Sequence, residues 1–335
     1  MKIAIHHRPG SFSNEWISFC KKNDIDYKIV NAFDSNIIEQ VKDCDGFLWH
    51  YSHTIFEDVL VAKKVLFTLD HLGIKTYPNY KTGWHFDDKV AQKYLFEGMG
   101  APFINSYVFY EKKEAVEWAK NTMYPKVFKL KGGAGAINVK LVRNKKEALK
   151  LVNKAFSNGF GQFDRMAHFK ERFNKFKGGQ DSFIGVLKAL FRFFIIPEFA
   201  KKQSNEKGYI YFQDFIPNNS YDTRVVVIGG ARAVAEKRFV RENDFRASGS
   251  GMFDFENINL EVIEKGFEIA KKLELQSVAF DFILDENNKP LVIEMSYGFG
   301  TSGIKSVSGY WDDNLTWHKG ECKPEQWILE SFLKG

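Results

Sequence analysis

The chain has 335 residues, of which 44% are hydrophobic, and its formal net charge at pH 7 is +6. This length is typical of about two domains, and the hydrophobic content is high enough for folded cores, which excludes a disordered chain. The three cysteines, Cys20, Cys44 and Cys322, form no CxxC pair, which argues against a zinc ribbon and favours a reducing compartment.

The amino-terminal segment MKIAIHHRPG has no long apolar core and no small-residue cleavage site, so the sequence predicts no signal peptide. No segment reaches the roughly 18 apolar residues of a membrane helix, and we therefore expect a cytoplasmic protein. The charge is uneven. Residues 155–207 contain ten Lys/Arg and five Asp/Glu, which accounts for +5, so the remainder is nearly neutral and a nucleic-acid partner is not expected.

The first 80 residues alternate between strand and helix patterns. Strands are expected at 2–7, 26–31, 46–51 and 74–79, and helices at 13–23, 34–42 and 55–73. Such alternation predicts a small Rossmann-like parallel α/β domain. Its first strand leads into RPGSFS and not into GxGxxG, so the dinucleotide fingerprint is absent.

The rest of the chain has an α+β pattern. Helices are expected at 86–99, 259–273 and 324–334, two glycine-joined strands within 123–142, several strands within 208–240, and a hairpin over 277–296. Gly229 and Gly230 mark one further hairpin turn.

The hairpin over 277–296 carries two acidic residues. If Leu284 pairs with Leu291, Asp281 lies directly opposite Glu294. Two facing carboxylates destabilise a sheet unless a cation lies between them, and oxygen ligands of this kind suit Mg²⁺. The alternative is that both side chains point to solvent and repel weakly.

A glycine-rich segment follows a lysine-bearing strand. Alternation places Val127, Lys129 and Lys131 on one face, and Gly132, Gly133 and Gly135 then allow backbone N–H groups to approach an anion. A strand follows these glycines, which excludes the Walker A loop. The segment is either a lid over phosphates or an ordinary hairpin.

A cationic run, EKRFVRENDFRASGSG, contains Lys237, Arg238, Arg241 and Arg246. Clustered cations beside small residues suit a transferring phosphoryl group, although a solvated charge run is the commoner outcome.

In chain order, Lys89, Lys129 with its glycines, FQDFI, DTR, DFR, Asp281 and Glu294 resemble the ATP-grasp superfamily over about residues 80–300. Members include D-alanine–D-alanine ligases and the glutamate ligases that modify a ribosomal protein. The resemblance implies an N-terminal preATP-grasp domain (1–83), a first lobe (84–210) and a second lobe (211–335), with Mg·ATP bound between two α+β lobes.

The resemblance also implies a role for each matching residue. Lys89 would approach the α-phosphate, Lys129 the α- and β-phosphates, and the glycines would cover the triphosphate. Gln213, Asp214 and Ile216 would read adenine, and Asp222 would bind the ribose. Lys237 or Arg238 would contact the γ-phosphate, and Arg246 would stabilise the acyl phosphate and the tetrahedral state. Asp281, Glu294 and Ser296 would occupy the metal positions.

Ser296 departs from the family pattern, in which this position is usually asparagine. A hydroxyl is a poorer Mg²⁺ ligand than an amide oxygen, so a second metal ion is in question.

Residues 155–207 form a basic, Phe-rich insertion where the family has a shorter link. Met166, Phe169, Phe173 and Phe176 follow helical spacing. The insertion either packs on the ATP lobe, forms a homodimer, or lies on the inner face of an anionic membrane. The aromatic segment after the hairpin, with Trp311 and Trp317, is typical of sugar sites or of a core. Together these features are similar to ATP-grasp proteins of bacterial surface-polysaccharide loci.

Three functions follow from the resemblance. The first is a carboxylate–amine ligase that forms an amide and releases ADP and phosphate, with a saccharide uronic acid as one carboxylate. The second is a kinase that phosphorylates a hydroxyl, and the third is a regulatory nucleotide-binding module without turnover. The sequence contains no GxSxG and no HExxH, which agrees with ligation chemistry that needs no protein nucleophile.

Overall fold

The computed structural model describes the chain except residues 134–137, 162–203, 242–243, 248, 250 and 335. It forms two compact units, the first comprising residues 1–86, 94–103 and 218–335 and the second residues 87–93 and 104–217. The first unit therefore contains both the expected N-terminal domain and most of the expected second lobe.

The first unit begins with a parallel sheet in the strand order β2-β1-β3-β4. Its elements are β1 (Ile3–His6), α1 (Ser13–Lys22), β2 (Tyr27–Val30), α2 (Ile37–Val41), β3 (Gly46–Leu48), α3 (Phe56–His71), β4 (Lys75–Tyr77) and α4 (Tyr80–Gly83). Strands β1 and β3 are buried along their whole length, as expected for parallel strands covered on both faces. The predicted parallel α/β sheet is confirmed.

The first unit also contains a seven-stranded sheet in the order β13-β12-β9-β10-β14-β15, with β11 paired to β10. Its elements are β9 (Tyr221–Ile228), β10 (Arg232–Phe239), β11 (Phe253–Asp254), α11 (Leu260–Lys272), β12 (Ser277–Leu284), β13 (Pro290–Ser296), the 3₁₀-helix η1 (Ile304–Ser306), β14 (Gly309–Asp312), β15 (Trp317–Lys319) and α12 (Pro324–Lys334). The hairpin expected over 277–296 is β12–β13.

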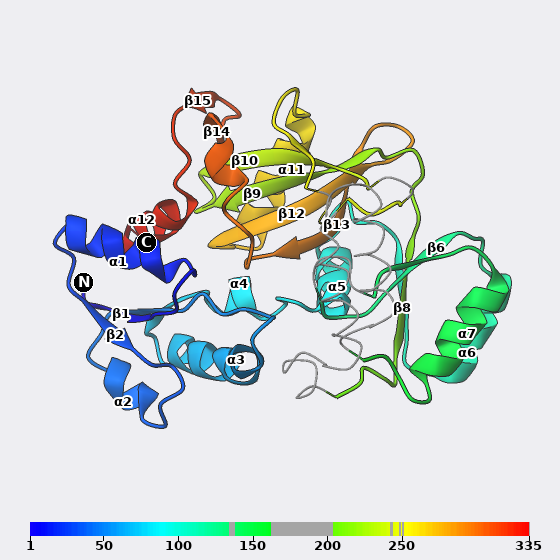
Figure 1. Cartoon of the computed structure of the whole chain (residues 1–335), viewed down its shortest axis with the longest axis horizontal. Coiled ribbons are helices and arrows are strands. Elements are labelled where there is room, and N and C mark those ends of the chain that lie inside the picture. Colours follow the sequence, from blue (N-terminus) through cyan, green and yellow to red (C-terminus); the bar gives the residue numbers. More distant parts are fainter. Residues whose placement is uncertain (134–137, 162–203, 242–243, 248, 250, 335) are drawn as a thin grey trace, which may run out of the picture. The chain divides into compact units, whose positions relative to one another are not determined.

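Side-chain alternation gives this sheet two different faces. One face packs against α11, which lies across the strands in Figure 1, and it contains Val225 and Phe280. Gly266 lets α11 approach closely, since a Cβ there would lie 3.0 Å from Val225 Cγ1. Val226 and Ala279 belong to the opposite face and share a core with the parallel sheet.

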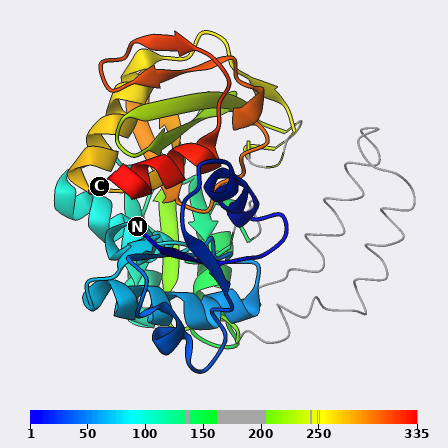
Figure 2. The same cartoon turned by 90° about the vertical axis from the view of Figure 1, so that its left-hand side faces the viewer.

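The terminal helix α12 completes that shared core. It lies beside α1 in Figure 2, where the indole Nε1 of Trp16 donates to the backbone oxygen of Glu325 at 3.0 Å. The two ends of the chain therefore belong to one folded unit.

The second unit contains a four-stranded antiparallel sheet in the order β5-β8-β6-β7. Its elements are β5 (Ser106–Phe109), α6 (Lys112–Asn121), β6 (Lys126–Lys129), β7 (Lys140–Val142), α7 (Lys145–Ala155) and β8 (Ile210–Asp214), while α5 (Lys89–Met99) has residues in both units. Small residues of α6 and α7, such as Ala115 and Ala148, share a core with Phe128 and Phe212 of the sheet. The two strands predicted around the glycines are β6 and β7.

The predicted insertion lies mostly outside the described residues, including its helical pattern of Met166, Phe169, Phe173 and Phe176. Among the helices that are described, none is long and apolar enough to cross a membrane.

Candidate functional site

Four charged residues form a row across the seven-stranded sheet. Glu236 of β10 lies opposite Arg224 of β9, Arg224 opposite Asp281 of β12, and Asp281 opposite Glu294 of β13. Residues directly opposite in neighbouring strands project from the same face. This row, which we call the charged row, therefore lies on the face that does not pack against α11.

The predicted pairing of Asp281 with Glu294 is confirmed, but the register used to predict it is wrong. Leu291 pairs with Ile283, and Leu284 pairs with Pro290. A β-bulge at Ile293 then shifts the register by one residue.

The bulge also determines the direction of Glu294. Val292 belongs to the core beneath α11, and a regular strand would place Glu294, two residues later, on that same face. Since Ile293 is inserted between the paired positions, Glu294 instead lies opposite Asp281. One irregularity thus brings the second carboxylate into the charged row.

Two guanidinium groups hold Asp281. Arg224 donates from Nε at 2.8 Å and from Nη2 at 3.0 Å, and Nη2 of Arg238 lies 2.8 Å from Oδ2. Burial opposes ionisation of Asp281, but the two arginines outweigh it and lower the pKa of this carboxyl below its usual range. Asp281 is therefore an ionised side chain, and it is only 5% exposed.

Arg238 also holds Asp222, the residue predicted to bind ribose. Nε and Nη2 of Arg238 donate to the two carboxylate oxygens of Asp222 at 2.6 and 2.7 Å. Burial raises the pKa of Asp222 to about 6, with Arg238 acting against this rise. The carboxylate of Asp222 is thus engaged within the protein and is not open to a ribose in this structure.

The two candidates for the γ-phosphate contact point in opposite directions. Arg238 lies two residues from Glu236 and projects from the face of the charged row. Lys237 projects from the other face, where Nζ lies 3.4 Å from Asp254 and 5.3 Å from the ring centre of Tyr221. The two members of the expected cation cluster that lie on β10 therefore project from opposite faces of the strand.

Arg246, the predicted acyl-phosphate contact, pairs with Asp244 two residues earlier. Its Nε and Nη2 donate to Asp244 Oδ2 at 2.8 and 2.6 Å. Burial alone would raise the pKa of the Asp244 carboxyl, but these bonds outweigh it and lower the pKa. The guanidinium therefore already shares two of its three nitrogens with Asp244.

The predicted metal residues have suitable chemistry but do not form a ready-made cage. The carboxylate of Asp281 already accepts three bonds, and the hydroxyl of Ser296 accepts from the backbone N–H of Gly298 at 3.2 Å. Within the described ranges, no group of three or more His, Cys, Asp or Glu is placed to hold a metal ion. Mg²⁺ commonly binds through one or two carboxylates together with nucleotide phosphates, and Glu294 with Asp281 fits that pattern only if Asp281 shares its oxygens.

In the second unit, the structure brings Lys89 to the glycine segment. Nζ of Lys89 donates to the backbone oxygen of Gly133 at 2.9 Å, and the N–H of Gly133 donates to Asp87 at 2.8 Å. Gly133 has a φ of 99°, which few residues other than glycine adopt. Lys129 is buried at the end of β6, and Gly135 lies outside the described residues.

The predicted adenine-reading segment occupies the end of β8 and the residues after it. The side chain of Gln213 is buried and donates to Ser106 Oγ at 3.1 Å. Asp214 forms an ion pair with Lys126 and accepts from Asn105 at 3.2 Å. Ile216 is half-buried, so the side chains of Gln213 and Asp214 are engaged within the protein and that of Ile216 is partly covered.

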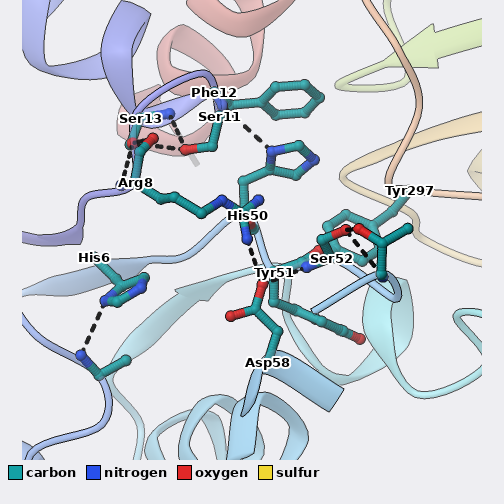
Figure 3. A network of polar contacts seen from close by, with 12 residues as sticks. His6, Arg8, Ser11, Phe12, Ser13, His50, Tyr51, Ser52, Asp58 and Tyr297 are labelled. Carbon is teal, nitrogen blue, oxygen red and sulfur yellow. Dashed lines mark hydrogen bonds and ion pairs between the residues drawn. The ribbon is translucent and has the colours of Figure 1, made fainter. Parts of the chain in front are cut away.

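The sequence analysis did not single out a network at the carboxyl edge of the parallel sheet. In Figure 3 the Arg8 side chain extends between His50 and Asp58, donating to Asp58 at 2.6 Å and to the backbone oxygen of His50 at 3.2 Å. Phe12 stacks on the ring of His50 at 3.6 Å. Strands β1 and β3 meet here at the point where the strand order reverses, which is where open α/β sheets bind ligands. The arginine two residues after the first strand was the signal in the sequence that could have pointed to this network.

Arg224 and Glu236 were also not assigned roles, although strand alternation in DTRVVVI and AVAEKRF places both on the face of Asp281. The signal was present, but it required knowing that β10, β9 and β12 are neighbours.

Residues 198–313 match the family model of the RimK-like ATP-grasp domain. No curated protein matches the sequence. Among solved structures, a RimK domain ATP-grasp protein from Sphaerobacter thermophilus is 13% identical, with a TM-score of 0.57, and the match covers 91% of this chain and 94% of that one.

Two other similar structures contain nucleotides. The biotin carboxylase domain of Hydrogenobacter thermophilus 2-oxoglutarate carboxylase, solved with MgADP, ADP and bicarbonate, is 14% identical, with a TM-score of 0.57 and coverage of 100% of this chain and 70% of that one. D-alanine–D-alanine ligase from Bacillus anthracis, solved with ATP, is 16% identical, with a TM-score of 0.50 and coverage of 90% and 88%. The chain thus has the ATP-grasp fold, and its residues 198–313 are similar to the RimK-like ATP-grasp domain.

Proposed function

We propose that this protein is an ADP-forming carboxylate–amine ligase. ATP would phosphorylate a carboxylate to an acyl phosphate, and an amine would then displace phosphate to form an amide. The observation that carries this proposal is the meeting of Asp281 and Glu294 at a bulged strand, on a face that also holds two arginines. A phosphoryl transfer site needs mainly fixed positive charge and metal-binding oxygens, and it needs no protein nucleophile.

We assign the nucleotide contacts to each unit separately. In the second unit, Lys89, Lys129 and the glycines Gly132, Gly133 and Gly135 would bind phosphates, while the main chain of 213–216 would bind adenine. Lys89 and Gly133 already touch through one hydrogen bond, which supports their joint role.

In the first unit, Glu294 and Asp281 would bind Mg²⁺ with the phosphates, with Ser296 a weaker third donor. Arg238 and Lys237 remain the candidates for the γ-phosphate, and Arg246 for the acyl phosphate. Asp222 would bind ribose only after releasing Arg238, which makes its assignment dependent on a rearrangement.

Calorimetry of ATP binding, with and without Mg²⁺, tests the site on wild type and Glu294→Gln. We expect wild type to bind Mg·ATP and Glu294→Gln to lose the dependence on Mg²⁺. Glu286→Gln removes the same charge from the exposed turn of the same hairpin and serves as the matched control. No binding by wild type at millimolar ATP would overturn the proposal.

A non-catalytic nucleotide-binding module is the second candidate, because arginines already make three contacts to the carboxylate of Asp281 and Ser296 stands where the resemblance implies asparagine. This candidate predicts ATP binding without ADP release for any carboxylate and amine. A kinase would instead release ADP with a carboxylate-free alcohol and leave a stable phosphorylated product.

We further propose a sugar uronic acid as the carboxylate substrate, on the strength of the aromatic segment after the hairpin. Trp311 and Trp317 pack together with ring centres 4.5 Å apart, and Trp317 is 41% exposed. ADP release with glucuronate or galacturonate, but not with the parent hexoses, is the expected result. The membrane or dimer role of 155–207 stays a prediction, which liposome flotation and sedimentation would test.

A further inference from the structure

Glu236 is a buried carboxyl that the phosphate and metal assignments leave unused. It occupies the end of the charged row on β10 and is 7% exposed. Its Oε2 is buried without a hydrogen-bond partner within the described chain. Buried carboxyl groups are normally hydrogen-bonded or paired, so such a group calls for an explanation.

The neighbouring cations do not provide that explanation. Arg224, directly opposite Glu236, donates to Asp281, and Arg238 donates to Asp222 and Asp281. Both guanidinium groups thus attract Glu236 only through space. Burial raises the pKa of the Glu236 carboxyl, and the two arginines only partly oppose this rise.

A glycine beside Glu236 belongs to the segment that follows the metal strand. A Cβ at Gly303 would lie 2.4 Å from Oε2 of Glu236. A larger residue at position 303 would displace the end of the Glu236 side chain. The carboxyl at this end of the charged row therefore lies against the segment that leaves β13.

We propose that Glu236 binds the protonated amino group of the amine substrate and takes up one of its protons, which leaves the nitrogen lone pair free to displace phosphate. This inference rests on the proposed ligase function, and it names the group that recognises the second substrate. A lone carboxylate fits an ammonium group better than a metal ion, because the described carboxylates around it do not form a metal cluster. Arg238, two residues along the same face, would lie beside it as the candidate phosphate contact.

The test uses the full-length protein and small amine probes: ethylamine, putrescine and glycinamide. Calorimetry measures the affinity for each probe, with and without a nonhydrolysable ATP analogue and Mg²⁺. We expect at least one probe to bind wild type, and Glu236→Gln to bind it about tenfold more weakly or worse, since a charge-assisted bond is lost. The affinity for the nucleotide should stay unchanged.

Two controls separate recognition of the amine from a general effect. Glu256→Gln removes an exposed carboxylate from the same unit and should leave probe binding unchanged. The N-acetylated form of the bound probe, which carries no ammonium group, should not bind wild type. Thermal unfolding of both variants verifies that they are folded.

Equal probe affinity for wild type and Glu236→Gln would overturn the proposal, and so would an absence of amine binding by wild type. The proposed ligase function is judged separately by the nucleotide titration. If ATP fails to bind while an amine still requires Glu236, the ligase assignment falls and the amine site stands.

Discussion

Replacing Asp281 by asparagine tests whether this side chain is held by arginines or kept open for a metal ion. The change keeps the shape of the side chain and removes its charge. In the structure Asp281 is 5% exposed and accepts three bonds from Arg224 and Arg238 at 2.8 to 3.0 Å. An amide has one acceptor oxygen, and its NH₂ group faces guanidinium donors with which it cannot bond.

Removing one partner of a buried ion pair costs about 3–5 kcal/mol, and little of this is screened because the site is buried. Arg238 keeps Asp222, so we expect the lower end, about 3 kcal/mol of unfolding free energy. For a unit of this size, that corresponds to a fall in Tm of roughly 10 °C.

The measurement is urea and thermal unfolding of the protein in EDTA without nucleotide. Glu286→Gln is the matched control, since it removes the same charge from the exposed turn of the same hairpin and should leave the stability unchanged. If Asp281→Asn is as stable as wild type, the guanidinium contacts do not form in solution. The carboxylate would then be available to a metal ion, as the sequence pattern alone predicts.

Three further predictions concern stability. Gly98→Ala lies at an exposed helical position with open space around it and should stabilise the protein by up to about 1 kcal/mol. Gly309→Ala should destabilise the protein by about 1–3 kcal/mol, because its Cβ would lie 2.3 Å from a backbone oxygen. Urea unfolding midpoints that fail to move in opposite directions would contradict this pair of predictions. Burial lowers the pKa of His6 from 6.5 to about 4, and its Nδ1 accepts from the N–H of Ala32. Between these two pKa values the unfolded chain binds more protons than the folded protein, so the wild type loses stability as the pH falls. The stability of His6→Asn relative to wild type should therefore improve on acidification, by up to about 1.4 kcal/mol per pH unit between pH 6.5 and about 4. A stability difference that urea titrations show to be independent of pH would refute this prediction. Glu236→Gln should raise the Tm of the ligand-free protein at pH 8, because an unpaired buried carboxylate is destabilising, and a lower Tm would show that Glu236 is satisfied within the fold.

Much of the fold could be predicted from the sequence, because hydrophobic alternation is a local property. The strand and helix periods before residue 80 correctly predicted the parallel sheet and its helices. The order of lysines, glycines and acidic residues along the chain resembled ATP-grasp proteins, and the family match and the fold support that resemblance.

The contacts within the site could not be predicted, because they depend on which strands are neighbours. Nothing local in DTR indicates that Arg224 faces Asp281, or that Arg238 joins Asp222 to the same carboxylate. The pairing of Asp281 with Glu294 was predicted from an incorrect register, and the bulge at Ile293 restored it. A bulge depends on the packing of the whole sheet and leaves little trace in one short segment.

The bulge at Ile293 has a consequence for how this hairpin can change during evolution. The loss or gain of a single residue between Asp281 and Glu294 would rotate Glu294 into the hydrophobic layer beneath α11, and a compensating change elsewhere in the hairpin would be needed to return it. Insertions should therefore be tolerated in the exposed turn, at 285–289, only in combinations that preserve the pairing of the two carboxylates. Among related chains, the number of residues between these two positions would then be a better guide to an intact site than the identity of the residues themselves.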